Sequence, residues 1–374
     1  MNFDFSDEQK LLREQVRRFL EERAACKRAR ALVDAGGGFD EELWQEMAEL
    51  GWLGAVVPDE FGGAGLGQVD LCVIAEELGR ANAAVPFISS VYLVTQALLC
   101  HGNHAQQNRW LPKLVAGDVV GALASHEAAG PLTPSRVRAQ ISAGELTGRK
   151  SPVADGKSAQ LLVVLAREGA GYGLYLAETG QAGMEVRDLE MTDPSRPAAS
   201  VSFDGVPVER LGTEDGWAVL DDLWNRAVVL AAFEQVGGAQ ACLDMAKEYA
   251  NERFAFGRPI GSFQAIKHKL ADVYIATELA RSNAYYGAWA LQADAPELPL
   301  AAAAARVAGC RAFELAAKEN IQVHGGMGFT WELDCHLYYR RAKSLGLALG
   351  SARVWKDRLV GRIEARNAPQ AETM

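Results

Sequence analysis

Hydrophobic residues in the first part of the chain recur at helical spacing, in stretches separated by turn residues. The first stretch opens at Ser6, which has the spacing of a capping box with Gln9. Its apolar face consists of Leu12, Val16, Phe19 and Leu20. This pattern predicts a helical N-terminal domain over residues 1–118.

The pattern changes after residue 118 to short apolar runs separated by Gly, Pro, Asp and Ser. The runs are 119–125, 136–141, 161–166, 174–177 and 199–203. Regular spacing of such runs is typical of an antiparallel sheet or barrel. We therefore expect a middle antiparallel β domain over residues 119–212.

Long helical patterns return in the last part of the chain. They cover residues 217–252, 262–293, 300–323 and 333–365. Each exceeds the usual length of a globular helix, which favours an antiparallel bundle. The fold class predicted is therefore α+β and multidomain, with a C-terminal four-helix bundle over residues 213–374.

Composition narrows the functional classes. The 374 residues are 49% hydrophobic and 23% charged, and the net charge of -10 argues against a nucleic-acid surface. No apolar run approaches the roughly 18 residues of a membrane span. The six cysteines are scattered without a Cys-x-x-Cys pair, which indicates reduced thiols of a cytoplasmic protein and no metal site.

The stretch 253–272 has the makeup of an anion-binding corner. A long helical pattern breaks at residues 257–261, Gly-Arg-Pro-Ile-Gly, and a second one starts after Ser262. Arg253 can offer a planar fork to a diphosphate, and the N-terminus of the second helix can offer free N–H groups. We therefore expect a large phosphorylated cofactor.

Several motifs occur together with this corner. They are Phe5-x-x-Glu8-Gln9, Pro58-x-Glu60-Phe61-Gly62-Gly63, Glu76-Glu77-Leu78-Gly79-Arg80, Trp110-Leu111-Pro112 with Gly117, and residues 322–329, Gln-Val-His-Gly-Gly-Met-Gly-Phe. In these motifs, and in its three-part order, the whole chain closely resembles the acyl-CoA dehydrogenase family.

The resemblance implies an FAD-dependent enzyme that removes the α and β hydrogens of an acyl-CoA thioester. It also implies dimers or tetramers whose FAD is shared between subunits, and an electron-transfer flavoprotein as acceptor. Carried over by motif, Arg253 would pair with the FAD diphosphate of a neighbouring subunit, with Phe256 beside it. The other cofactor-binding residues implied are Gln264 and Ile266 at the same corner, and Gln322, Gly325 and Gly326 on the adenine-ribose side.

The chain departs from the family pattern on the flavin side. The family's Thr-Glu-Pro loop corresponds to residues 125–134, where Glu127 is kept and His126 replaces the hydroxyl. The next flavin contact, a Trp-Ile-Thr run, corresponds to residues 150–156, without the aromatic ring and the hydroxyl. Both changes affect groups that would serve the chain's own flavin.

The catalytic base is also missing from its usual places. Removal of an α proton needs a carboxylate aimed at that carbon. The family's two positions for this glutamate correspond to Leu349 and to about Ala227, and neither is acidic. Glu234 is the first acid further along the same helix, seven residues on, and is the one named candidate base, with a residue of the β domain as the alternative. The catalytic residue is otherwise unassigned.

Three hypotheses follow. In the first, this chain is a subunit that completes the FAD site of a partner in a heteromer, a type that the family uses on bulky or steroid side-chain acyl-CoAs. In the second, it is a homomeric acyl-CoA dehydrogenase with a non-standard base. In the third, it is a non-catalytic structural subunit. The first explains why groups that reach a neighbour's FAD are kept while those for its own flavin are lost.

Overall fold

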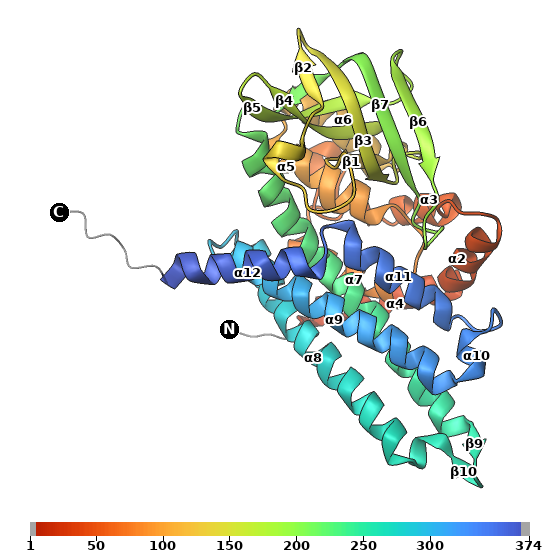
Figure 1. Ribbon diagram of the computed structural model, residues 1–374. Coiled ribbons are helices and arrows are strands. Elements are labelled where there is room, and N and C mark those ends of the chain that lie inside the picture. Colours follow the sequence, from red (N-terminus) through yellow and green to blue (C-terminus); the bar gives the residue numbers. More distant parts are fainter. Residues whose placement is uncertain (1–4, 368–374) are drawn as a thin grey trace.

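Helices make up the amino-terminal part of the protein (Figure 1), as seen in a computed structural model that describes residues 5–367. They are α1 (Asp7–Glu22), α2 (Ala25–Asp34), α3 (Glu41–Glu49), η1 (Asp59–Phe61), α4 (Gln68–Arg80), the π-helix η2 (Ile88–Thr95), α5 (Gln96–His101) and α6 (His104–Val115). The capping box is present, because the backbone N–H of Gln9 donates to Ser6 Oγ and that of Ser6 donates to Gln9 Oε1. The helical N-terminal domain is confirmed.

The middle of the chain folds into one eight-stranded sheet. Its strands are β1 (Gly121–Ala124), β2 (Gln140–Ser142), β3 (Glu145–Ala154), β4 (Leu161–Glu168), β5 (Gly171–Glu178), β6 (Met184–Leu189), β7 (Ala198–Pro207) and β8 (Glu209–Leu211), with η3 (Pro134–Arg136) before β2. The order is β6-β7-β3-β2-β4-β5-β8, and β1 pairs with β4.

The sheet is mixed, whereas the sequence predicted an antiparallel sheet or barrel. Most pairs are antiparallel, but β1 and β2 both run parallel to β4. The chain folds back along β3 before it enters β4, so β4 runs in the same direction as β2. Hydrophobic spacing predicts where the strands are, but not whether paired strands run parallel or antiparallel.

The carboxyl-terminal part is again helical. Its elements are α7 (Gly216–Glu252), β9 (Phe254–Ala255), β10 (Arg258–Pro259), η4 (Ile260–Ser262), α8 (Gln264–Gln292), α9 (Leu298–His324), α10 (Gly326–Phe329), α11 (Cys335–Ala348) and α12 (Ala352–Asn367). Helices α7, α8 and α9 pack along one another, and β9 and β10 project as a hairpin beyond them (Figure 1). Residues 368–374 of the predicted third domain lie outside the described residues.

The prediction of one continuous helix over 333–365 is wrong. The chain turns between α11 and α12, where Gly350 has a φ of 89°, in the left-handed region that favours glycine. The indole N–H of Trp355 donates to the backbone oxygen of Leu349 at 2.7 Å and holds this turn. The turn lets α12 cross α9 instead of continuing along α11.

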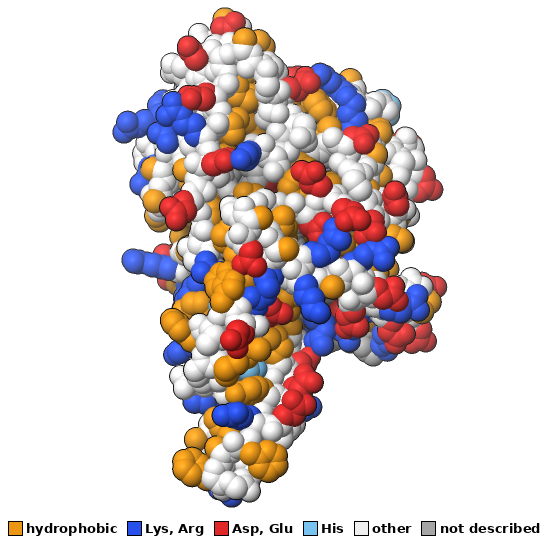
Figure 2. Space-filling model, turned by 90° about the vertical axis from the view of Figure 1, so that its right-hand side faces the viewer, with side chains coloured by type: hydrophobic (Ala, Val, Ile, Leu, Met, Phe, Trp, Pro, Cys, Tyr) orange, Lys and Arg blue, Asp and Glu red, His pale blue; other side chains and the backbone are white. Residues whose placement is uncertain are grey.

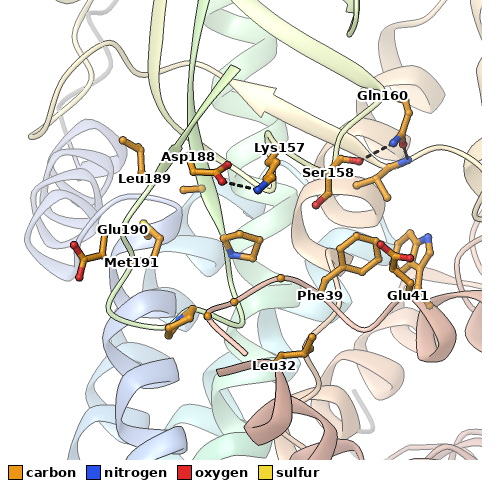
Figure 3. A pocket seen from close by; sticks show the side chains of 18 of the residues that line it. Leu32, Phe39, Glu41, Lys157, Ser158, Gln160, Asp188, Leu189, Glu190 and Met191 are labelled. Carbon is orange, nitrogen blue, oxygen red and sulfur yellow. Dashed lines mark hydrogen bonds and ion pairs between the residues drawn. The ribbon is translucent and has the colours of Figure 1, made fainter. Parts of the chain in front are cut away.

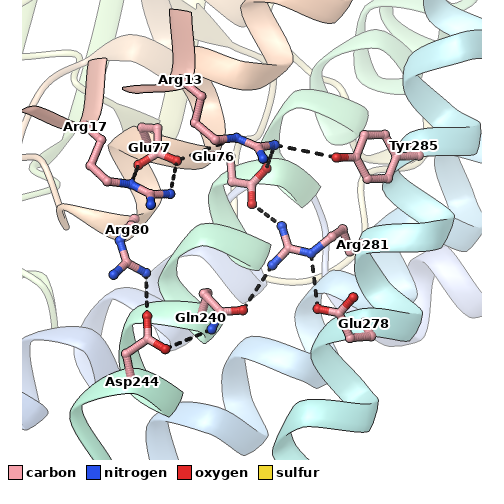
Figure 4. A network of polar contacts seen from close by, with 10 residues as sticks. All are labelled: Arg13, Arg17, Glu76, Glu77, Arg80, Gln240, Asp244, Glu278, Arg281 and Tyr285. Carbon is pink, nitrogen blue, oxygen red and sulfur yellow. Dashed lines mark hydrogen bonds and ion pairs between the residues drawn. The ribbon is translucent and has the colours of Figure 1, made fainter. Parts of the chain in front are cut away.

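Charged side chains attach α1 to the rest of the protein (Figure 4). On α4, Glu77 accepts from Arg17 at 2.7 Å, and Glu76 accepts from Arg13 at 3.2 Å. Glu76 also pairs with Arg281 of α8. The Glu76-Glu77 motif therefore connects α1, α4 and α8.

Two buried arginines connect all three parts of the chain. Arg341 of α11 donates to Asp193 at 2.7 Å and to the backbone oxygen of Ala83 at 2.9 Å. Arg196 donates to the backbone oxygen of Val85 at 2.7 Å and pairs with Glu234 of α7. Ser195 is hydrogen-bonded to both Asp193 and Arg341. We call this group the ionic junction; its members are Ala83, Val85, Asp193, Ser195, Arg196, Glu234 and Arg341.

In the part of the chain that the structure describes, no helix is long and apolar enough to cross a bilayer. All six cysteines are free thiols. Burial raises the pKa of Cys72 and Cys242 well above the ordinary thiol value, which keeps both protonated at neutral pH.

We predict that Asp193→Ala lowers the free energy of unfolding at pH 7 by about 3 to 5 kcal/mol, because it leaves Arg341 buried without its partner. Burial alone would raise the pKa of Asp193, but Arg341 and Ser195 hold it below its ordinary value of 3.8. The stabilisation is therefore complete above that value and is lost as the pH falls below it.

Thermal or urea unfolding between pH 3 and pH 7 measures this difference. The matched control is Asp188→Ala, which removes an exposed partner of Lys157 and should cost at most about 1 kcal/mol. An equal loss for Asp193→Ala at all pH values would contradict the role of the ionised carboxylate.

Candidate functional site

Arg253 stands where α7 ends and the hairpin begins. Its backbone N–H donates to Tyr249 at 2.8 Å, and its backbone oxygen accepts from Ile260 at 2.8 Å. The backbone is thus held from the helix and from the hairpin. The guanidinium is exposed, and within residues 5–367 it makes no ion pair.

The hairpin ends in an exposed aromatic tip. Phe256 and Gly257 both have positive φ, 55° and 78°, as a tight two-residue turn requires. A bulky residue in this conformation is uncommon. The Phe256 side chain is 95% exposed and Phe254 62%, and Figure 2 shows hydrophobic side chains on the surface of this narrow end.

The structure gathers the other predicted cofactor residues at the same end of the bundle. Gln264 is the exposed first residue of α8, and Gln322 is exposed in the last turn of α9. Ile266 packs on a small core that joins the three helix ends. That core is Ala246, Ala250 and Val323.

Gly325 and Gly326 follow at the end of α9, and both are exposed. Gly325 has a φ of 59°, and a Cβ at either position would have no atom within 4 Å. Their backbone is therefore open to close approach by a ligand.

The corner is rich in cations that have no internal partner. At this corner, Arg253, Arg258 and Lys267 are exposed and make no ion pair with an acidic side chain of the described residues. Arg258 lies over the Phe263 ring at 4.1 Å, which orients its guanidinium. Unpaired cations beside the first turn of α8 fit a diphosphate.

The flavin-side loop is arranged differently. Lys150 of β3 is fully buried, and its ammonium donates to Glu127 at 2.7 Å and to the backbone oxygen of Ser125 at 3.3 Å. Glu127 also accepts from the backbone N–H groups of Arg138 and Ala139. The one acid kept from the family loop thus neutralises a buried lysine.

His126 belongs to this loop, and its ring faces Trp224 of α7. Its Nδ1 is 3.0 Å from Ser125 Oγ, and its ring centroid is 6.0 Å from that of Trp224. Burial, Lys150 and Arg136 all lower the pKa of His126 below its ordinary value of 6.5. The imidazole is therefore neutral at pH 7.

The two positions to which the family resemblance assigns the base are both packed in the core. Ala227 is fully buried on α7, and Leu349 is 4% exposed. Glu234, the candidate base, is fully buried, with one oxygen paired to Arg196 of the β domain. Its carboxylate is thus part of the ionic junction.

The sequence reasoning missed Trp224 and Arg358. Arg358 of α12 lies 5.0 Å above the Trp224 ring and 4.7 Å above the Trp355 ring. The only local signal is the spacing of Trp355 and Arg358 along one helix face. The contact with Trp224 joins residues more than a hundred positions apart.

A cleft of about 1000 Å³ lies elsewhere, between the α2–α3 loop, the end of β6 and α11 (Figure 3). Lys157 and Asp188 on its rim are paired with each other at 2.5 Å. The cleft shares no lining residue with the Arg253 corner or the loop 125–127. We assign it no ligand.

Two family models match the chain. The N-terminal domain of acyl-CoA dehydrogenase matches residues 6–118, and the C-terminal domain matches residues 214–363. A relative from Mycobacterium tuberculosis, acyl-CoA dehydrogenase IpdE2, is 34% identical over 96% of this chain and 98% of its own.

The chain belongs to the acyl-CoA dehydrogenase family.

Acyl-CoA dehydrogenases are FAD-dependent oxidoreductases, so FAD is the cofactor that the site must fit. Two solved structures are similar over nearly the whole chain. The ChsE4-ChsE5 complex of M. tuberculosis has a TM-score of 0.89 and 29% identity, and covers 99% of this chain and 100% of that one. The Tcur3481-Tcur3483 steroid ACAD has a TM-score of 0.87 and 30% identity, and covers 97% and 99%.

We predict that the imidazole of His126 titrates with a midpoint below 6.5, as followed by NMR of the histidine ring signals. Lys150→Met should move the midpoint upward, because it removes a positive charge that opposes protonation. The control is Lys157→Met, an exposed lysine in the turn that follows the same strand, which should leave the midpoint unchanged. A midpoint at or above 6.5 in the wild type would show that His126 is not held in this environment.

Proposed function

We propose that this chain is the subunit of a heteromeric acyl-CoA dehydrogenase that completes the FAD site of a partner chain. The observation that carries the proposal is Arg253, whose guanidinium is exposed at the foot of a projecting hairpin and makes no ion pair within residues 5–367. A buried or paired arginine could not serve a neighbour. A rigid backbone with a free guanidinium is suited to a ligand that arrives with another chain.

The chemistry proposed is α,β-dehydrogenation of an acyl-CoA thioester. FAD, when bound, accepts hydride from the β carbon of the acyl group. Arg253 would hold the diphosphate through its two parallel N–H groups, and Phe256 would cover the cofactor beside it. Gln264 and Ile266 would form the wall at the start of α8. Gln322, Gly325 and Gly326 would line the adenine-ribose side.

The burial of Ala227 and Leu349 supports a heteromer over a self-sufficient homomer. Neither position offers a carboxylate, and Glu234 is committed to Arg196. Moving Glu234 towards a substrate would leave a buried guanidinium unpaired, at a cost of several kcal/mol. We therefore propose that the partner supplies the base.

Similarity to the ChsE4-ChsE5 complex and to a steroid ACAD supports the same assignment. The ChsE4-ChsE5 complex and the Tcur3481-Tcur3483 steroid ACAD are both near 30% identical to this chain. We propose a bulky acyl group of the steroid class, a dimer of dimers, and an electron-transfer flavoprotein as acceptor.

We predict that Arg253→Ala weakens FAD binding by the assembled complex by about 10- to 100-fold, because charge-assisted hydrogen bonds to the diphosphate are lost. Arg253→Lys should weaken FAD binding by a smaller factor, since lysine keeps the positive charge but loses the planar fork of the guanidinium. Arg311→Ala is the matched control, an exposed arginine of α9 that makes no ion pair with any residue the structure describes. Flavin fluorescence on dilution measures the dissociation constant.

Unchanged FAD affinity in Arg253→Ala would overturn the assignment of the corner. Candidate partner chains should be co-expressed with this one, and flavin bleaching by acyl-CoA should be recorded for each pair. Full FAD content and bleaching in this chain alone would overturn the heteromer.

A further inference from the structure

We propose that Asp155 is a neutral carboxylic acid in the folded protein, and that its ionisation as the pH rises loosens the contact between β3 and the π-helix η2. The inference does not depend on the proposed function, because it concerns the β domain and not the Arg253 corner. It assigns to the fold a contact that responds to pH.

The carboxyl group of Asp155 is held inside the protein. Asp155 directly follows the last residue of β3, and its side chain is 4% exposed. Its backbone N–H donates to the backbone oxygen of Pro197 at 2.8 Å, which fixes the turn after β3. Its carboxyl oxygen Oδ2 lies 2.6 Å from the hydroxyl oxygen of Ser89 on η2. The side chain therefore joins β3 to η2, and it cannot reach water unless this turn moves.

The hydroxyl group of Ser89 has two acceptors for one hydrogen. Its Oγ lies 2.6 Å from Asp155 Oδ2 and 3.5 Å from the backbone oxygen of Ala154. An ionised Asp155 would take the hydroxyl hydrogen and leave Ala154 without it. A protonated Asp155 would instead donate to Ser89 Oγ, and the hydroxyl hydrogen would then be free for Ala154. The geometry at Ser89 thus favours the neutral acid.

The guanidinium groups beside Asp155 already have carboxylate partners. Arg341 pairs with Asp193 at 2.7 Å. Arg196 pairs with Glu234. Among the residues that the structure describes, Asp155 forms no ion pair with either arginine. The ionic junction therefore balances two positive charges with two negative ones, and an ionised Asp155 would add an unpaired negative charge to a buried region.

The other titratable groups nearby supply no further positive charge. Tyr92 of η2 faces Glu234 and Arg196, and burial raises the pKa of Tyr92 well above its ordinary value of 10, so its hydroxyl stays neutral. Lys150 lies on β3 itself, but its ammonium is bound to Glu127 at 2.7 Å. An ionised Asp155 would thus have no cation of its own.

The pKa of Asp155 gives the direction of the response. Burial raises this pKa above its ordinary value of 3.8. Arg196, Ser89 and Arg341 oppose the shift but do not cancel it. A carboxyl group whose pKa is raised on folding contributes stability that is complete below its unfolded value and is lost as the pH rises through the folded one. Asp193 responds in the opposite direction, because its pKa is lowered.

The helix η2 is attached to the sheet at two adjacent residues. Ser89 contacts Asp155, and Ser90 Oγ accepts from the backbone N–H of Gly121 in β1 at 3.2 Å. Only the first contact contains a titratable group. An ionised carboxylate gains contact with water only if the turn after β3 moves away from η2. The response is therefore expected at residues 88–95 and 153–156.

Urea unfolding of the full chain between pH 4 and pH 9 tests the inference, with wild type and Asp155→Asn compared at each pH. Asparagine keeps the shape of the neutral acid and cannot ionise. The ratio of the wild-type unfolding constant to that of the variant should rise with pH. The rise should be about tenfold for each pH unit by which the folded pKa exceeds 3.8. A ratio that is constant or falls as the pH rises would overturn the inference.

Two other asparagine variants are the controls. Asp193→Asn should show the opposite trend, because the ionised form of that carboxyl is the stabilising one. Asp188→Asn removes an exposed partner of Lys157, and its ratio should change by less than about threefold over the same range.

Amide hydrogen exchange of the wild type gives a second measure, which decides the question even if Asp155→Asn does not fold. Exchange is recorded at pH 5 and pH 9 and corrected for the intrinsic rate at each pH. Protection of residues 88–95 and 153–156 should fall by at least about threefold at pH 9. In folded Asp155→Asn it should stay the same. Unchanged protection in the wild type would contradict a contact that loosens on ionisation.

Discussion

The ionic junction is the constraint on which the arrangement of the whole chain depends. Two guanidinium groups, Arg196 and Arg341, are buried where the three parts meet, and each has both a carboxylate and a backbone oxygen as partner. A buried charge is tolerated only when it is paired and hydrogen-bonded, so neither arginine can leave without a large cost. The sheet, the N-terminal helices and α7 are therefore held in one fixed relation.

Because of this constraint, successive stretches of α7, a helix of 37 residues, have different roles. Trp224 and Ala227 face the packed interior near the start of α7. Glu234, further along, is part of the ionic junction, and Arg253 caps the C-terminal end of the helix. From Glu234 to Arg253 the helix rises by about 28 Å. The same helix thus carries a closed interior at one end and an exposed cationic corner at the other. A chain built in this way is suited to act on a ligand outside itself.

Much of this structure could be predicted from the pattern of residues, and the remaining features could not be predicted for a physical reason. Periodicity gave α7, α8 and α9 and the helix-sheet-helix order, and the motif at Arg253 indicated a corner that the structure does assemble from three helix ends. The turn at Gly350 was missed, because a single glycine also occurs within helices. The Arg196–Glu234 pair and the contact of Trp224 with Arg358 join distant segments, and no local pattern reports such contacts.

The most direct test is an experimental structure of the FAD-loaded assembly, in which the distance from the Arg253 guanidinium to the FAD diphosphate is measured. We predict a hydrogen-bond distance of about 3 Å to a diphosphate whose flavin ring lies in another chain. An Arg253 in solvent, or one bound to an FAD whose ring lies against His126 of this type of chain, would contradict it.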